Sequence, residues 1–199
     1  MTTPDSDLEF APLDIEWASI KCKSTDCKNN LHCFQQDKQD SGAGSGGRCR
    51  ECGAKLVDWS RVQRRDLQDS AYTFSMLRHE MIRHRFWHRP LDPRERNYAR
   101  RKGRVGIRAA AEKRIRSSVG PKEPFKNGAQ TPFKGHILYY AQHAVACCCR
   151  RTCIAEWHGI PQGRELTDLV CMYVAERIPE LTENGEDVPP IRKPQKLEV

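Results

Sequence analysis

Long apolar runs are absent from this sequence. No stretch approaches the roughly 20 consecutive apolar residues that cross a bilayer, so we expect no membrane span. The first ten residues, MTTPDSDLEF, are acidic and polar, whereas a secretory signal begins with basic residues followed by an apolar run. We therefore expect a cytoplasmic protein that makes no contact with membranes.

Carboxylates are scarce in the region richest in cysteine and histidine. Between residues 147 and 166 the only acids are Glu156 and Glu165, and two-metal phosphodiester chemistry normally uses several. The zinc-protease pattern is missing as well, because His79 and His84 of HEMIRH are five positions apart and that pattern requires four. The first absence argues against a two-metal nuclease, and the second excludes a zinc protease of that type.

Cysteine, by contrast, is plentiful, with ten in 199 residues. In a reducing compartment, clustered cysteines hold metal more often than they form disulfides. Cys22 and Cys27 have C-x4-C spacing, and Cys49 and Cys52 have C-x2-C spacing. Two such pairs supply the four thiolates of a tetrahedral zinc site, which predicts a zinc ribbon. The neighbouring residues 32–33, a histidine and a cysteine, are alternatives to Cys22 or Cys27 as ligands.

A second cluster lies in AQHAVACCCRRTCIAEWHGIP, residues 141–161. On a helix, Cys149 and Cys153 lie one turn apart, so we expect them to bind a second metal together with His143 and His158. Three alternatives remain. The first is an open metal site with three protein ligands and a water. The second is an iron–sulfur cluster held by Cys148, Cys149 and Cys153. In the third, no metal is bound and the cysteines are small buried residues of the core.

Positive charge is concentrated in the middle of the chain. The formal net charge is +8, and residues 78–126 hold 16 Lys and Arg against five acids. Arg outnumbers Lys there by 12 to 4, and Arg suits bidentate contacts to phosphate. We expect a nucleic-acid partner, DNA rather than RNA. The candidate contact residues are Arg83, Arg85, Arg100, Arg101, Lys102, Arg104 and Arg108.

Hydrophobic periodicity predicts helices over residues 72–87, 104–117 and 137–157, and a further helix that begins after the N-cap Thr167. The fold class is therefore α+β. We expect a mainly helical domain of about four helices around the Cys/His cluster, with an N-terminal zinc ribbon of short antiparallel strands.

Composition divides the chain into four parts. An acidic arm covers residues 1–20 and the cysteine-rich module covers residues 21–60. The helical domain covers residues 61–182, and a polar, proline-containing flexible tail follows over residues 183–199.

Three motifs carry a resemblance to a known family: NGAQTPFKGHILYYAQHA at 127–144, CCR at 148–150 and EWHGIPQGREL at 156–166. Over about residues 86–179 the chain resembles an uncharacterised bacterial family, domain of unknown function 4186, and the ribbon lies outside it. The resemblance implies that His136, His143, the cysteines and His158 belong to one site, although the family has no assigned activity. With Gln130 of the QTP motif, His136 and His143 are the candidate catalytic residues.

Three functions remain open at the level of sequence. The first is a zinc protein, with one or two ions, that binds nucleic acid through the ribbon and the basic helices. The second is a metal-dependent nuclease or base-processing enzyme that uses the His/Cys cluster to activate water. The third is an iron–sulfur or redox protein whose chemistry depends on Cys148, Cys149 and Cys153.

Overall fold

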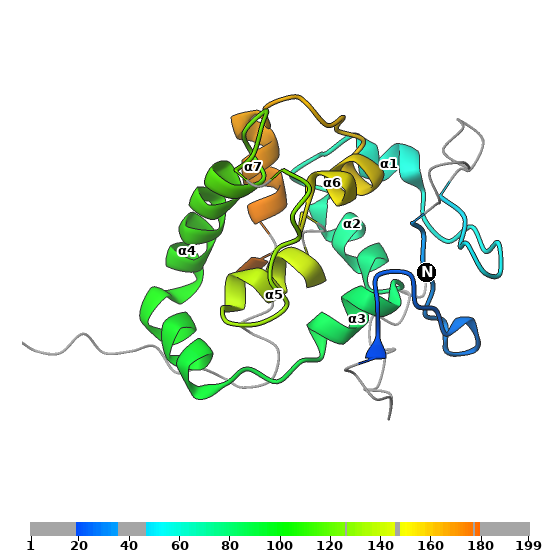
Figure 1. Ribbon diagram of the computed structural model, residues 1–199, viewed down its shortest axis with the longest axis horizontal. Coiled ribbons are helices and arrows are strands. Elements are labelled where there is room, and N and C mark those ends of the chain that lie inside the picture. The colour runs from blue at the N-terminus through cyan, green and yellow to red at the C-terminus, as the bar shows by residue number, and fades with distance from the viewer. Residues whose placement is uncertain (1–18, 36–46, 126, 146–147, 177, 180–199) are drawn as a thin grey trace, which may run out of the picture.

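The computed structural model describes residues 19–35, 47–125, 127–145, 148–176 and 178–179. Helices dominate this part of the chain, which confirms the mainly helical class. They are the 3-10 helix η2 (Cys27–Asn29) and the α-helices α1 (Trp59–Gln63), α2 (Ser70–Leu77), α3 (Met81–Trp87), α4 (Pro93–Ser118), α5 (Ile137–Ala144), α6 (Arg151–His158) and α7 (Asp168–Ala175) (Figure 1).

Helix α5 lies at the centre of the molecule, between α3 and the long helix α4 (Figure 1). Seven of its eight residues are buried, including Ile137, Tyr140 and Ala144, so the helix is covered on every side. Helix α7 packs on α4, while α1 packs on α2 and α6. One continuous hydrophobic cluster runs through these helices and includes Leu31 and Phe34 of the N-terminal segment.

The helix expected over residues 72–87 is divided into α2 and α3. The backbone of His32 pairs with the intervening turn: its N–H donates to the His79 carbonyl at 2.6 Å, and its carbonyl accepts from the Met81 N–H at 3.0 Å. These two groups cannot take part in a continuous helix and also pair with another segment. A tertiary contact therefore overrides the local periodicity.

The helix expected over residues 137–157 is also divided. Helix α5 ends at Ala144 and α6 begins at Arg151. Between them the Cys148 N–H donates to the Gln142 carbonyl at 3.1 Å, and the Cys149 carbonyl accepts from the Thr131 N–H at 2.9 Å. Cys149 therefore lies just before α6, so of the pair Cys149 and Cys153 only Cys153 lies on the helix.

Helix α4 begins earlier than expected, because Asp92 and Glu95 form a capping box at its start. Its course is interrupted at Gly103, where φ is 61° and ψ is 175°. The helix expected at the end of the domain is confirmed as α7, with the Thr167 side chain accepting a hydrogen bond from the Val170 N–H. Within the described residues, no helix is long and apolar enough to cross a bilayer.

The short antiparallel strands expected in the ribbon are not found in the described parts of residues 21–60. Those parts contain turns and two isolated bridges, Asp26 with Leu31 and His32 with Glu80. The second bridge joins the N-terminal segment to the helical part, so residue 32 does not pair with a ribbon strand. The predicted tail and most of the predicted arm lie outside the described residues, and the domain boundaries stay predictions.

Candidate metal centre

Four side chains of the N-terminal segment converge on one point. The ligand atoms of Cys27, His32, Cys49 and Cys52 all lie within 4.8 Å of one another. In the part of the chain that the structure describes, no other group of three or more Cys, His, Asp or Glu side chains is placed to hold one ion. Of the two metal sites expected from the sequence, the N-terminal one therefore exists as a possible metal-binding cluster, and it contains His32.

Two tight turns present these ligands. After η2 the backbone turns at Asn30, which has a φ of 58°, a conformation that asparagine tolerates better than most residues. The second turn is closed by a hydrogen bond of 2.9 Å from the Gly53 N–H to the Cys49 carbonyl. Gly53 has a φ of 73°, where the lack of a Cβ atom removes the steric penalty.

The spacing of the four ligand atoms suits zinc. The sulfurs of Cys27 and Cys49 are 3.8 Å apart, and Nδ1 of His32 is 3.4 Å from the Cys52 sulfur. Tetrahedral zinc with bonds of about 2.3 Å to sulfur and 2.0 Å to nitrogen separates two sulfurs by about 3.8 Å and a sulfur from a nitrogen by about 3.5 Å. Three thiolates and one imidazole therefore fit this ion.

The other nitrogen of the His32 ring is held by a neighbouring side chain. Nε2 lies 3.0 Å from Oδ1 of Asn30, and Nδ2 of Asn30 lies 3.4 Å from Nδ1 of His79. A proton on Nε2 donated to Asn30 leaves the lone pair of Nδ1 directed at the cysteines. Histidines that bind metals are usually oriented through their second nitrogen in this way.

The environment of Cys49 favours a thiolate. Although burial opposes its ionisation, hydrogen bonds from the backbone at Cys33, Cys52 and Glu51 lower its pKa to about 6. Burial and shared hydrogen bonds with Cys52 and Cys49 instead raise the pKa of Cys27 to about 12. A metal ion would replace that remaining proton, because zinc binds the thiolate form.

Cys22, a predicted ligand, lies outside the four-residue group. Its sulfur accepts a hydrogen bond of 3.4 Å from Nε2 of Gln130, and its carbonyl accepts one of 3.4 Å from the Cys33 thiol. The side-chain amide of Gln130 therefore bonds to Cys22. The structure thus brings together Cys27, Cys49 and Cys52 of the predicted set and adds His32 in place of Cys22.

The second predicted metal set is only partly brought together. The sulfurs of Cys149 and Cys153 are 3.3 Å apart, and that hydrogen bond, with burial, raises the pKa of Cys149 well above its usual range. His143 is buried, places Nε2 2.9 Å from the Thr131 carbonyl and stacks on Phe86. His158 is buried and packs edge-on against Tyr173.

His136, a candidate catalytic residue, caps α5. Its Nδ1 accepts a hydrogen bond of 3.1 Å from the Leu138 N–H, and its ring contacts Tyr98 and Tyr139. Burial lowers its pKa, with a further contribution from the nearby positive charge of Arg114. The catalytic roles of His136, His143 and Gln130 stay predictions.

The predicted nucleic-acid contacts differ in their exposure. Arg83 is buried, and Arg85 is half-buried with Nη1 donating to the Ile20 carbonyl at 2.7 Å. Arg108 is half-buried in an ion pair of 2.8 Å with Glu176. The remaining four residues are exposed on α4: Arg100, Arg101, Lys102 and Arg104.

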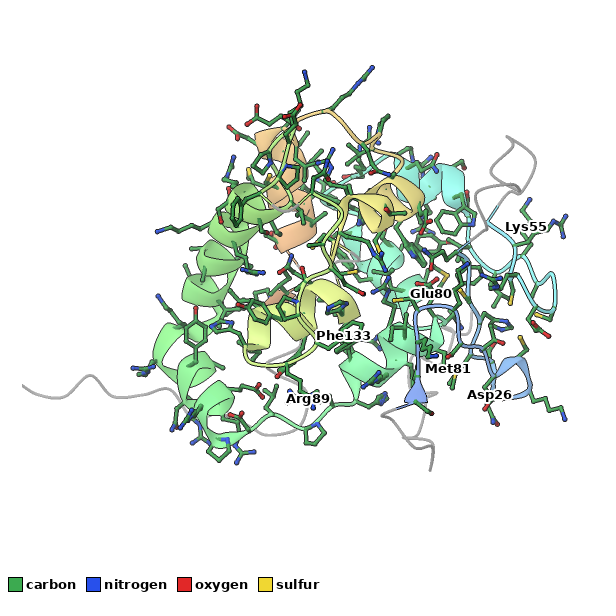
Figure 2. The ribbon with its side chains drawn as sticks, viewed as in Figure 1. Asp26, Lys55, Glu80, Met81, Arg89 and Phe133 are labelled. Atoms are coloured by element: carbon green, nitrogen blue, oxygen red, sulfur yellow. The ribbon has the colours of Figure 1, made fainter. Side chains whose placement is uncertain are left out.

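Glu80 is a structural residue that the sequence did not indicate. Its carboxylate is buried and receives hydrogen bonds from the Phe34 N–H at 3.1 Å, Trp157 Nε1 at 3.1 Å and Arg83 Nε at 3.2 Å. Figure 2 shows Glu80 and Met81 beside the N-terminal segment. Glu80 therefore joins that segment to α3 and α6. The only sequence signal was its position within the apolar pattern of residues 72–87.

The chain matches the model of a family described as a domain of unknown function (DUF4186) over residues 71–182. This range is more than half of the 199 residues, so the chain belongs to that family. Helices α3 to α7 lie inside the matched range, and all four residues of the metal centre lie before it. No solved structure matches the chain.

Proposed function

We propose that the protein binds one zinc ion through Cys27, His32, Cys49 and Cys52, and binds nucleic acid through the exposed basic surface of α4. The zinc proposal rests on one observation, the convergence of these four ligand atoms within 4.8 Å. Four protein ligands fill the tetrahedral coordination of zinc and leave no position for a substrate. The ion therefore has a structural role.

Zinc stabilises the docking of the N-terminal segment on the helical part. His32 is a ligand through its side chain, and through its backbone it bonds to His79 and Met81 on either side of Glu80. The two cysteines of residues 49–52 come from a segment separated in sequence from His32. Binding of the ion joins these segments, so it contributes to the free energy of folding.

The nucleic-acid proposal rests on the charge of α4. An open hollow on this helix is lined by Arg94, Asn97, Arg100 and Arg101, and Lys102 and Arg104 are exposed close by. Glu95, an acid of the same helix half, is buried against Arg89 and does not offset this exposed charge. Such a surface suits phosphates, because arginine and lysine release counterions when they bind the backbone.

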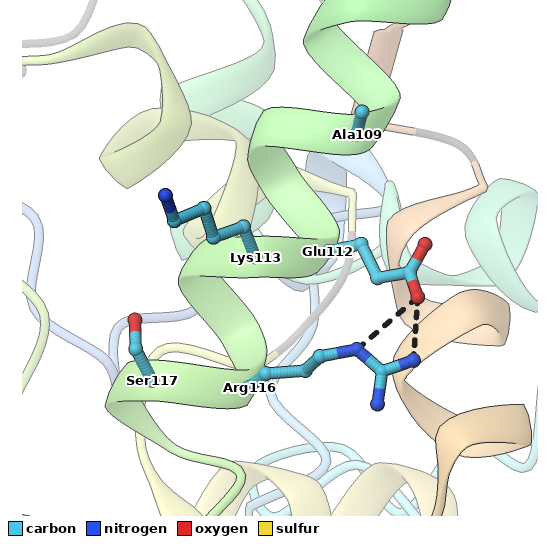
Figure 3. Close-up of a pocket in the computed structure, with 5 residues that line it drawn as sticks. All are labelled: Ala109, Glu112, Lys113, Arg116 and Ser117. Carbon is cyan, nitrogen blue, oxygen red and sulfur yellow. Dashed lines mark hydrogen bonds and ion pairs between the residues drawn. The ribbon is translucent and has the colours of Figure 1, made fainter.

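The second half of α4 differs from the first. Figure 3 shows a hollow there lined by Glu112, Lys113, Arg116 and small residues, with Glu112 and Arg116 paired. Arg116 bonds to Glu112 at 2.6 Å and also pairs with Asp168 of α7. The charge of Arg116 is therefore neutralised within the protein, so we expect the phosphate contacts mainly on the first half of α4 and at the break at Gly103.

Fluorescence anisotropy with labelled duplex DNA and with RNA of the same sequence tests this proposal. Changing Arg100, Arg101 and Arg104 together to Ala should weaken binding at least tenfold and reduce the salt dependence by about three counterion-releasing contacts. The charge-matched control changes Lys21, Lys28 and Lys55, all exposed on the N-terminal segment. Equal weakening by both variants, or none by either, would exclude α4 as the specific binding surface.

A further inference from the structure

Two thiols that are not part of the metal centre contact each other inside the helical domain. The Cys149 thiol donates a hydrogen bond to the Cys153 sulfur over 3.3 Å. Cys149 precedes the N-cap Arg150, and Cys153 is the third residue of α6. The partial positive charge at a helix N-terminus favours a thiolate at Cys153.

A fixed guanidinium lies beside both sulfurs. Arg83 is buried and places Nη1 3.8 Å from the Cys149 sulfur and Nη2 3.9 Å from the Cys153 sulfur. It is oriented by Glu80, at 3.2 Å, and by the His143 carbonyl, at 2.7 Å. This cation stabilises negative charge on sulfur and opposes the entry of a metal cation between the thiols.

Two half-buried side chains, Arg150 and Cys22, lie near the pair. Arg150 is half-buried, and its charge interacts with the sulfurs of Cys153, Cys22 and Cys149. Cys22 is itself half-buried and is bonded to the Gln130 side chain. Cys149 is fully buried and Cys153 is 4% exposed, so only a small neutral reactant could reach the pair.

We propose that Cys149 and Cys153 form a redox site that reduces hydrogen peroxide and closes an intramolecular disulfide. The Cys153 thiolate attacks one peroxide oxygen, so that an S–O bond forms, the O–O bond breaks and hydroxide leaves to become water. Cys149 then attacks the sulfur of the resulting sulfenic acid, an S–S bond forms, and the second oxygen leaves as water with the Cys149 proton. Two thiols and one peroxide give one disulfide and two waters.

Non-reducing peptide mapping of the full-length, metal-loaded chain tests this site. The reduced protein is treated with one equivalent of hydrogen peroxide, denatured with iodoacetamide and digested with trypsin. Trypsin cleaves after Arg150 and Arg151, which lie between the two cysteines, so the disulfide joins two separate peptides. We expect this linked pair as the main product. Cys27, Cys49 and Cys52 fall in other peptides, so oxidation of the metal centre is recognised separately.

Two variants locate the reacting sulfurs. Cys148→Ser is the matched control, because Cys148 is equally buried next to Cys149 and should leave the linked peptides unchanged. Cys149→Ser should stop the reaction at a sulfenic acid on Cys153, which dimedone traps. The proposal is overturned if wild-type protein carries iodoacetamide on both thiols after peroxide, or if Cys153 links to another cysteine. Either of these two results would overturn the redox site alone, because zinc content and DNA binding are measured separately and do not depend on it.

Discussion

At the scale of residues, the choice of His32 over Cys22 as a ligand defines the metal centre. Cys22 and Cys27 have the spacing C-x4-C, and Cys27 and His32 have the equivalent spacing C-x4-H. The sequence therefore left open whether Cys22 or His32 is the ligand. The deciding feature is the backbone pairing of His32 with His79 and Met81, together with its contact to Asn30. The backbone contacts to His79 and Met81 involve residues far apart in the chain and could not be inferred from local spacing.

Variants at these two positions should behave differently. His32→Ala removes a ligand and should lower zinc affinity by at least tenfold, whereas Cys22→Ser should keep one zinc per chain, because Cys22 lies outside the group. Equilibrium dialysis against a zinc chelator, with elemental analysis of the retained protein, measures both. Loss of zinc from Cys22→Ser with retention in His32→Ala would reverse the assignment.

At the scale of elements, the sequence predicted helices wherever local signals determine them. Thr167 caps α7 as expected, and the apolar spacing located the regions of α2, α3 and α5. It missed the break at residues 78–80 and the separation of α5, which ends at Ala144, from α6, which begins at Arg151. In these places the backbones of His79 and Met81 bond to His32, and the Cys149 carbonyl bonds to Thr131. In the described parts of residues 21–60 the expected strands are also absent, and there His32 pairs with Glu80 and not with a ribbon strand.

The break in α4 gives a prediction at this scale. Gly103→Ala should destabilise the protein by about 1–3 kcal/mol, because a φ of 61° with a ψ of 175° is accessible almost only to glycine. The cause is backbone strain alone, as no atom lies within 4 Å of an added Cβ. Gly106→Ala is the control. Its Cβ would lie 3.3 Å from the Cβ of Lys102, a close contact, while alanine favours helix by about 1 kcal/mol and the φ of Gly106 needs no left-handed backbone. Urea unfolding of both variants measures the difference, and equal stability would contradict the strain at Gly103.

At the scale of the whole molecule, the N-terminal segment and the family domain share one interior. Phe34 packs edge-on against Trp59 and Trp157, and all three lie in or against the common hydrophobic cluster. Glu80 adds a buried polar connection between the same parts. We therefore expect damage at this junction to affect the entire fold.

Glu80→Gln tests this connection. The change leaves Arg83 buried without its charged partner, and such losses typically destabilise proteins by about 3–5 kcal/mol. We expect one cooperative thermal transition with a lower Tm. Circular dichroism at 222 nm measures this transition. Glu51→Gln, at an exposed position beside Cys52, should leave Tm within a degree or two. A separate early transition in Glu80→Gln, with the transition of the helices unchanged, would show that the N-terminal segment and the helical part unfold independently.

The most direct test of the metal centre is X-ray absorption at the zinc edge on the full-length, zinc-loaded protein. We expect one zinc per chain with three sulfur ligands at about 2.3 Å and one nitrogen at about 2.0 Å. Four sulfurs would place a fourth cysteine, Cys22 or Cys33, at the ion and contradict the assignment of His32. A first shell made mainly of oxygen and nitrogen would contradict the metal centre itself.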